Sequence, residues 1–184
     1  MCAASLEFVG IALVERHEKG HMVRLMALDI GEVRIGVAVS DATGFLASPY
    51  TTLHRSRSEE QTWQSIQRLI DETEAEGLVV GLPISLDGQI HAQGERVQAF
   101  AERLQQRISI PLTFWDERLS TVEAQRLLTQ REQDESEPRR RQGTRRRTQS
   151  RRRQKGQKID ALAATVILQD YLDALGNKIE EERS

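Results

Sequence analysis

The sequence predicts an α/β fold in which a mixed sheet of five strands is flanked by helices. Three strand-like segments follow one another closely at the start, which favours an antiparallel beginning. Two short, continuously apolar segments then alternate with segments of helical periodicity, as is typical of parallel strands joined by helices. The 184 residues, 38% of them hydrophobic and only 4% aromatic, suit one domain with an aliphatic core.

The first three strands are predicted in residues 22–30, 33–41 and 45–55. Gly31 and the residue after it separate the first two strands, a spacing short enough for a β-hairpin. The third strand contains Pro49, which has no amide hydrogen to donate, so we expect an irregular or edge strand.

The remaining elements alternate between helices and strands. Ser58 is expected to cap a helix from Glu59 to about residue 76, because apolar residues recur there at helical spacing. A buried strand (77–83), a helix (93–107), a strand (110–115) and a helix opening at 120–128 follow. A last helix is predicted in 158–175, and its apolar stripe comprises Leu162, Ala163, Val166, Ile167, Leu172 and Leu175.

Positive charge is concentrated in residues 139–158. This segment carries +11 with no acidic residue, whereas the rest of the chain carries about −13. Its six-residue arginine repeat does not match the helical period, so we predict a disordered arm for polyanions within a flexible insertion at 134–157. The alternative is a solvated insertion, or one that docks on acidic protein or ribosomal surfaces. The arginines are Arg139, Arg140, Arg141, Arg145, Arg146, Arg147, Arg151, Arg152 and Arg153.

The rest of the composition indicates a cytoplasmic protein. Cys2 is the single cysteine, which excludes an internal disulfide and a cysteine-based zinc site. The apolar run at residues 8–14 is too short to span a membrane, and charge follows it rather than a cleavage site. We expect an N-terminal extension at 1–21, a folded domain at 22–176 and a charged tail at 177–184.

Acidic residues stand where the predicted strands end. Asp29 closes the first strand and precedes Gly31 and Gly36, so it could face a metal while a phosphate approaches bare backbone; a turn-forming aspartate is the alternative. Asp116 and Glu117 end the fifth strand, where ligands gather in α/β sheets, although they could instead cap the next helix. Asp160 opens the last helix, which could direct it toward the first and fifth strands or merely place it at a helix dipole.

Three carboxylates from such separated segments would form the hard-oxygen site that Mg²⁺ or Mn²⁺ prefers. Two such ions about 4 Å apart can activate a water and stabilise the leaving oxygen in phosphodiester hydrolysis.

Four segments resemble the signature segments of the YqgF/RuvX family and run in that family's order. They are "MALDIGEVRIGVAVSD", "VVGLPISLDG", "DERLSTVEAQRLL" and "KIDALAATVILQDYL", which cover most of residues 22–172. The resemblance implies an RNase H-like fold and a nuclease. Members are described as Holliday junction resolvases and as nucleases that mature the 5′ end of precursor 16S rRNA.

The resemblance also implies roles for individual residues. The catalytic, metal-binding set would be Asp29, Glu117 and Asp160, holding two Mg²⁺ or Mn²⁺ ions. Arg34 and Arg118 would contact phosphates, with the arginines of the arm as further nucleic-acid contacts. Residues expected around the acidic set are Asp116, Ser120, Thr121 and Asp87. The long arginine repeat and the residues before Met22 depart from the family pattern.

The expected function is therefore a metal-dependent nuclease in 5′-end processing of precursor 16S rRNA, with ribosomal particles as further partners. A Holliday junction resolvase acting on four-way DNA is the alternative, either as a monomer or as a homodimer. A non-catalytic RNA- or ribosome-binding protein that works through its arm is an alternative of another class. A sugar-kinase-like ATPase is disfavoured, because 184 residues do not accommodate the two domains that enclose a nucleotide.

Overall fold

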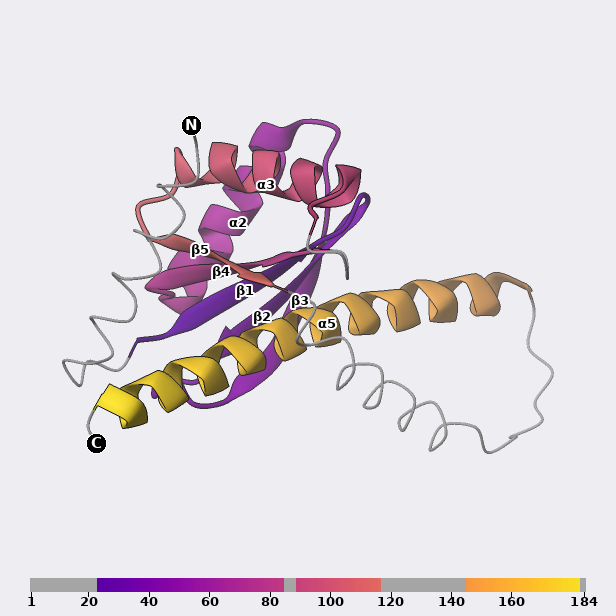
Figure 1. Cartoon of the computed structure of the whole chain (residues 1–184). Coiled ribbons are helices and arrows are strands. Elements are labelled where there is room, and N and C mark those ends of the chain that lie inside the picture. Colours follow the sequence, from indigo (N-terminus) through magenta and orange to yellow (C-terminus); the bar gives the residue numbers. More distant parts are fainter. Residues whose placement is uncertain (1–22, 85–88, 117–144, 183–184) are drawn as a thin grey trace, which may run out of the picture.

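The fold is built on one mixed sheet with the strand order β3-β2-β1-β4-β5 (Figure 1). The computed structural model describes residues 23–84, 89–116 and 145–182. The strands are β1 (Leu25–Ile30), β2 (Arg34–Ser40), β3 (Ala47–His54), β4 (Gly77–Leu82) and β5 (Leu112–Asp116). β1, β2 and β3 are antiparallel neighbours, whereas β1, β4 and β5 run parallel. The predicted fold class is confirmed, and the carboxyl ends of the parallel strands meet at one edge.

Pro49 has the effect that the sequence predicted. It lies in β3, which forms the outer edge of the sheet beside β2. The register between these strands shifts between Val37 and Ala38, and Ala38 is the partner of Pro49. The edge position tolerates the missing amide hydrogen, since β3 has only one neighbouring strand to bond.

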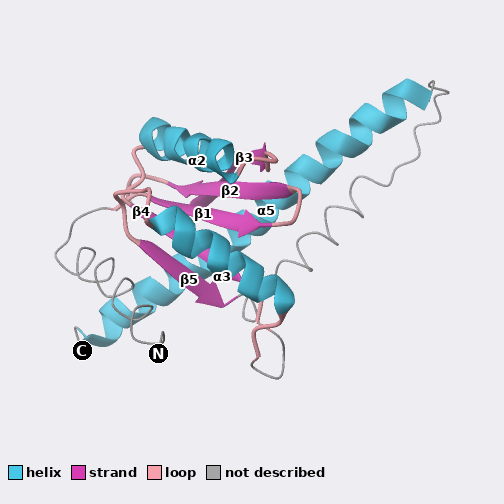
Figure 2. Cartoon of the chain, turned by 90° about the horizontal axis from the view of Figure 1, so that it is seen from above, coloured by secondary structure: helices cyan, strands magenta, loops and turns pink. Residues whose placement is uncertain are grey.

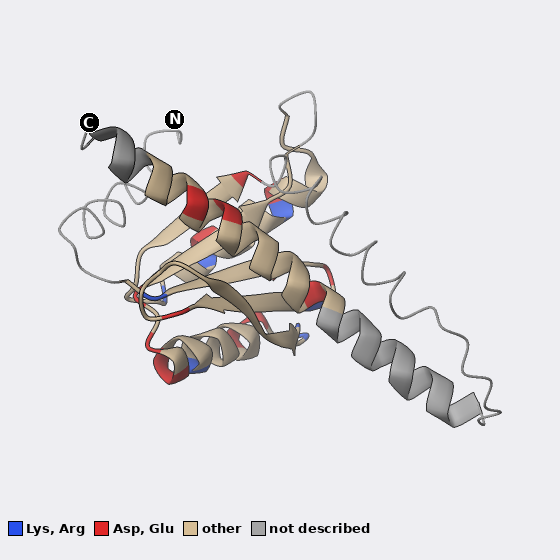
Figure 3. Ribbon diagram, turned by 90° about the horizontal axis from the view of Figure 1, so that it is seen from below, with Lys and Arg blue, Asp and Glu red and all other residues tan. Residues whose placement is uncertain are grey.

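Helices cover both faces of the sheet (Figures 1, 2 and 3). Helices α2 (Glu59–Thr73) and α3 (Ala92–Gln105) lie on one face, and α5 (Arg145–Glu182) crosses the other. Side chains of β1 alternate between the two cores: Met26 packs on the α2/α3 side and Ala27 on the α5 side. None of the helices in the described part of the chain has a stretch apolar enough to cross a membrane.

The last helix is longer than the sequence predicted. It begins at Arg145 and ends at Glu182, so the expectation of a disordered arm is wrong for residues 145–157 and the charged tail is helical to 182. Arginine and glutamine are good helix formers, and extending an existing helix adds one hydrogen bond for each residue fixed. Residues 139–144 and the helix predicted at 120–128 lie outside the described residues.

The predicted apolar stripe of this helix is partly wrong. Leu162, Ala163 and Val166 are only half-buried, whereas Ile167, Leu172 and Leu175 are buried as predicted. Because this segment is apolar nearly all round, its periodicity could not fix which side faces the sheet. The residues that pack against the sheet are Ala164, Ile167, Leu168, Tyr171, Leu172 and Leu175.

Gly36 sets how closely α5 approaches the sheet. A Cβ atom at this position would lie 1.9 Å from the carbonyl oxygen of Asp160 and 2.4 Å from its carbonyl carbon. The helix backbone therefore rests directly on the backbone of β2. The sequence had suggested that a phosphate approaches bare backbone near Gly31 and Gly36; at Gly36 this is wrong, because the helix fills that space.

We predict that Gly36→Ala destabilises the fold by about 3 kcal/mol or more, because neither backbone can move away without unpacking α5. Urea unfolding followed by circular dichroism measures the change. Gly176→Ala is the matched control. Gly176 lies in α5, and nothing lies within 4 Å of a Cβ atom at its position. It should raise stability by about 0.5–1 kcal/mol. Equal effects of the two substitutions would contradict the role given to Gly36.

Candidate active site

Asp29 lies near the carboxyl end of β1, at the edge where the parallel strands end. Its cross-strand partner is Gly36. Because side chains alternate along a strand, Asp29 shares a face with Leu25 and Ala27, which pack against α5. The side chain is half-buried. Asp29 therefore points under the helix rather than out of a turn.

Asp160 lies well inside α5, which begins at Arg145. The alternative of a carboxylate at a helix dipole is thereby excluded, because that effect is confined to the first turn. The backbone of Asp160 rests on Gly36, the residue paired with Asp29. Burial, and after it the negative charge of Asp160, raises the pKa of Asp29 from its usual 3.8 to about 6. Two of the three predicted acidic residues thus lie close together.

Arg34 binds one member of this pair. It opens β2, and its Nε donates a short hydrogen bond to Oδ2 of Asp160, while Nη2 lies 3.4 Å from Oδ1. The side chains of Arg34 and Asp160 are 35% and 21% exposed, so the ion pair stands at the boundary with solvent. Among the described residues, no hydrogen-bond donor reaches the carboxylate of Asp29. Within the described residues, Asp160 thus has a guanidinium partner whereas Asp29 has none.

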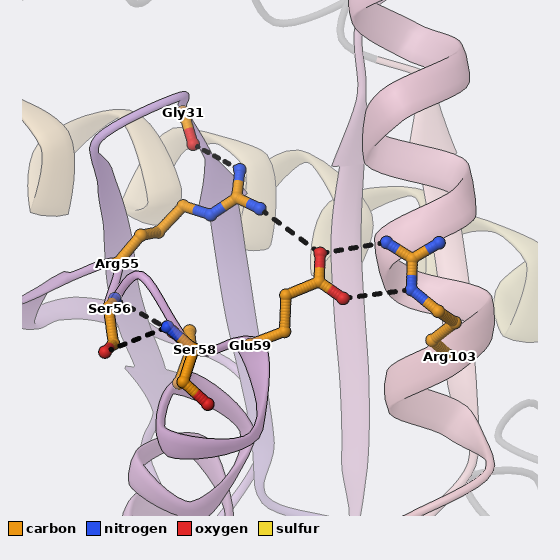
Figure 4. Close-up of polar contacts among 7 residues, drawn as sticks. Gly31, Arg55, Ser56, Ser58, Glu59 and Arg103 are labelled. Carbon is orange, nitrogen blue, oxygen red and sulfur yellow. Dashed lines mark hydrogen bonds and ion pairs between the residues drawn. The ribbon is translucent and has the colours of Figure 1, made fainter.

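A polar network braces the turn that follows Asp29 (Figure 4). The guanidinium of Arg55 donates to the carbonyl oxygen of Gly31 at 3.2 Å, and the Arg55 amide donates to Val33 at 2.9 Å. The same guanidinium lies 3.9 Å from Glu59 at the start of α2, and Glu59 accepts two hydrogen bonds from Arg103 of α3. The turn between Asp29 and Arg34 is thereby tied to both helices of the opposite face.

Sequence analysis missed Arg55. The only available signal was an arginine at the end of the predicted third strand, three residues before the cap of the next helix. Ser58 does stand at the N-cap of α2, as predicted, but its side chain makes no capping hydrogen bond; its amide instead donates to Ser56 Oγ at 3.3 Å.

Asp116 ends β5 at the same edge of the sheet, paired with Leu82. Leu112 and Phe114 belong to the core on the α2/α3 side, and Asp116 follows them in the alternation. It therefore lies on the face opposite Asp29.

The other predicted site residues are not described structurally. Asp87, Glu117, Arg118, Ser120, Thr121, Arg139, Arg140 and Arg141 lie outside the described residues. The remaining arginines of the repeat, between 145 and 153, belong to α5.

The pair formed by Asp29 and Asp160 fits a divalent cation. Carboxylate oxygens are the ligands that Mg²⁺ and Mn²⁺ prefer, and a cation between them would offset the repulsion that raises the pKa of Asp29. The guanidinium of Arg34 already occupies a position beside Asp160, so the site accommodates positive charge. Within residues 23–84, 89–116 and 145–182, no third acidic, histidine or cysteine side chain completes a larger cluster.

A family model described as "RuvX: Holliday junction resolvase" matches residues 23–174. The chain belongs to the RuvX family. A protein of Thermoanaerobacter pseudethanolicus, described as "Putative pre-16S rRNA nuclease", is 41% identical over 156 residues, which cover 85% of this chain and all of that protein. A protein of Moorella thermoacetica with the same description is 42% identical over 154 residues, covering 84% of this chain and 97% of the relative.

Among solved structures, the yeast mitochondrial Holliday junction resolvase Ydc2 shares the fold of this RuvX-family chain. The two align with a TM-score of 0.50 at 8% identity, covering 94% of this chain and 88% of the other. The family resemblance and the RNase H-like fold that the sequence predicted are thereby confirmed.

The burial of Asp29 predicts a pH-dependent effect of Asp29→Asn on stability. The raised pKa means that the charged carboxylate destabilises the fold: the cost is absent below about pH 4, grows as the pH rises through 6, and is complete above it. In EDTA, the asparagine variant should exceed the wild type in unfolding free energy by about 2–3 kcal/mol at pH 8 and by almost nothing at pH 4. Urea unfolding of both proteins at the two pH values measures this difference, and a gain independent of pH would contradict the assignment.

Proposed function

We propose that this protein is a metal-dependent nuclease that hydrolyses phosphodiester bonds during 5′-end processing of precursor 16S rRNA. The observation that carries the proposal is the convergence of Asp29 and Asp160 at the carboxyl edge of the sheet. Nothing in packing requires two carboxylates there, since their repulsion weakens the fold. Such arrangements are retained where the charge is used to bind a cation or to do chemistry.

In this proposal Asp29, Asp160 and Glu117 together hold two metal ions, either Mg²⁺ or Mn²⁺. The ions would supply an activated water and stabilise the leaving oxygen of the phosphodiester. The protein's own contribution is positional: β1 fixes Asp29, the contact at Gly36 fixes Asp160, and Glu117 directly follows the last residue of β5. Arg34 and Arg118 would contact the phosphates, with Asp116, Asp87, Ser120 and Thr121 as neighbours of the site.

The arginine repeat supplies affinity rather than chemistry. The charge of +11 on residues 139–158 would hold a polyanion near an otherwise acidic body by releasing counterions, without reading the base sequence of the nucleic acid. The partner we propose is precursor rRNA, free or within ribosomal particles, in the cytoplasm. The names of the two relatives favour RNA. The description of the family model favours four-way DNA junctions, which stay as the second candidate substrate.

We expect Asp29→Asn and Asp160→Asn each to abolish Mg²⁺-dependent cleavage, by at least about 10³-fold, while nucleic-acid binding persists. Cleavage of a labelled precursor 16S rRNA leader and of a four-way DNA junction is measured side by side. Because Asp29→Asn should also stabilise the fold, unfolding does not account for its loss of activity.

Asp173→Asn is the matched control, since Asp173 is an exposed carboxylate on the same helix. It should cleave like the wild type. Full activity in both site variants would overturn the proposal and favour a non-catalytic protein that works through its arm. Cleavage of the junction but not of the leader would favour the resolvase.

A further inference from the structure

Arg34 and a divalent cation need the same atoms. The guanidinium of Arg34 reaches both carboxylate oxygens of Asp160, one of them through a short hydrogen bond. A cation shared by Asp29 and Asp160 must coordinate an oxygen of that same carboxylate. Since charge-assisted hydrogen bonds are among the strongest in proteins, the cation has to compete with Arg34.

The backbone at this site is fixed, whereas the arginine side chain is free to move. Asp160 is held by the contact of its backbone with Gly36, and Asp29 lies within a strand paired on both sides. Arg34, in contrast, is about one-third exposed and its guanidinium ends a long, flexible side chain. Competition is therefore resolved by Arg34 leaving Asp160, not by a separation of the two carboxylates.

The charges favour the exchange. The single positive charge of Arg34 does not balance the two negative charges of Asp29 and Asp160. A net negative charge therefore stays in a partly buried place, where solvent screens charges poorly. A divalent cation neutralises both carboxylates, which Arg34 alone does not. The released guanidinium then stands at the carboxyl edge of the sheet with no acidic partner, beside the place to which a substrate phosphate would come.

We propose that Arg34 exchanges partners during the working cycle: it occupies Asp160 until a divalent cation displaces it, and then binds a phosphate of the nucleic acid. This inference rests on the proposed function, because it assumes that Asp29 and Asp160 bind the cation. Arg34 thereby couples the two binding events, so that nucleic acid is bound tightly only once the cation is in place.

The first test measures Mn²⁺ binding by isothermal titration calorimetry. Removing the competitor in Arg34→Gln should tighten Mn²⁺ binding roughly tenfold, and Arg34→Lys should fall between, since lysine offers no paired donors. Arg96→Gln is the matched control: Arg96 pairs with Glu32 in the neighbouring turn at 3.1 Å, so it reports the loss of one positive charge near the site. It should change Mn²⁺ affinity less than about twofold.

The second test measures binding of a labelled single-stranded RNA by fluorescence anisotropy, with EDTA or with Ca²⁺ as a cation that supports binding. Arg34→Gln should weaken RNA binding in Ca²⁺ by roughly tenfold and leave it nearly unchanged in EDTA. An arginine that contacts phosphate at all times would weaken binding equally in both conditions, and that result overturns the exchange.

The outcomes separate this inference from the proposed function. Suppose that Asp29→Asn removes Mn²⁺ binding but Arg34→Gln leaves it unchanged or weakens it. This result overturns the exchange of partners by Arg34, whereas the proposed metal site stands. A wild-type protein that binds no Mn²⁺ overturns both. Circular dichroism of each variant confirms that it is folded before titration.

Discussion

The backbone of α5 passes over Gly36 with no room for a side chain between them, and the position of the candidate site follows from that contact. It sets the rotation of the helix, so that Asp160 faces the sheet together with Ala164, Ile167 and Leu168. It also brings Asp160 over the cross-strand partner of Asp29. Keeping Asp29 charged here costs about 2–3 kcal/mol in all, chiefly because the carboxylate is buried and secondarily because Asp160 repels it. Each apolar side chain buried under α5 contributes about 1.5–3 kcal/mol, so several together outweigh it.

The position of these carboxylates explains why the chain combines an acidic folded body with a strongly basic arginine repeat. The folded body is acidic and holds carboxylates at the edge where nucleic acid is proposed to bind, so a polyanion would be repelled. Two sources of positive charge in the chain oppose this repulsion, Arg34 within the site and the arginine repeat, and the divalent cation that we propose between the carboxylates would be a third. The repeat is separated from Asp160 by only a few residues of one continuous helix, so the proposed function would place affinity and chemistry on the same element.

Most of the framework could be predicted from the sequence, because each element carries a local signal. Pro49 marked the edge strand, the glycines around residues 77–82 marked a buried strand, and Val97, Phe100 and Leu104 marked the buried side of α3. The errors fell on α5, where local signals were ambiguous. An apolar segment without a polar side does not reveal its rotation, and the arginine repeat has no apolar side at all, yet its helix is continuous with a packed one.

The sequence by itself determined the order of strands and helices, the family, and the candidate carboxylates, because these depend on periodicity and on short motifs along the chain. Only the tertiary structure decided that Asp29 and Asp160 lie together, that Arg34 binds Asp160, and that Arg55 braces the turn after Asp29. These contacts join residues far apart in the chain, in the case of Arg34 and Asp160 by 126 positions. They depend on how a helix is seated on a sheet, and a missing Cβ at Gly36 fixes that seating.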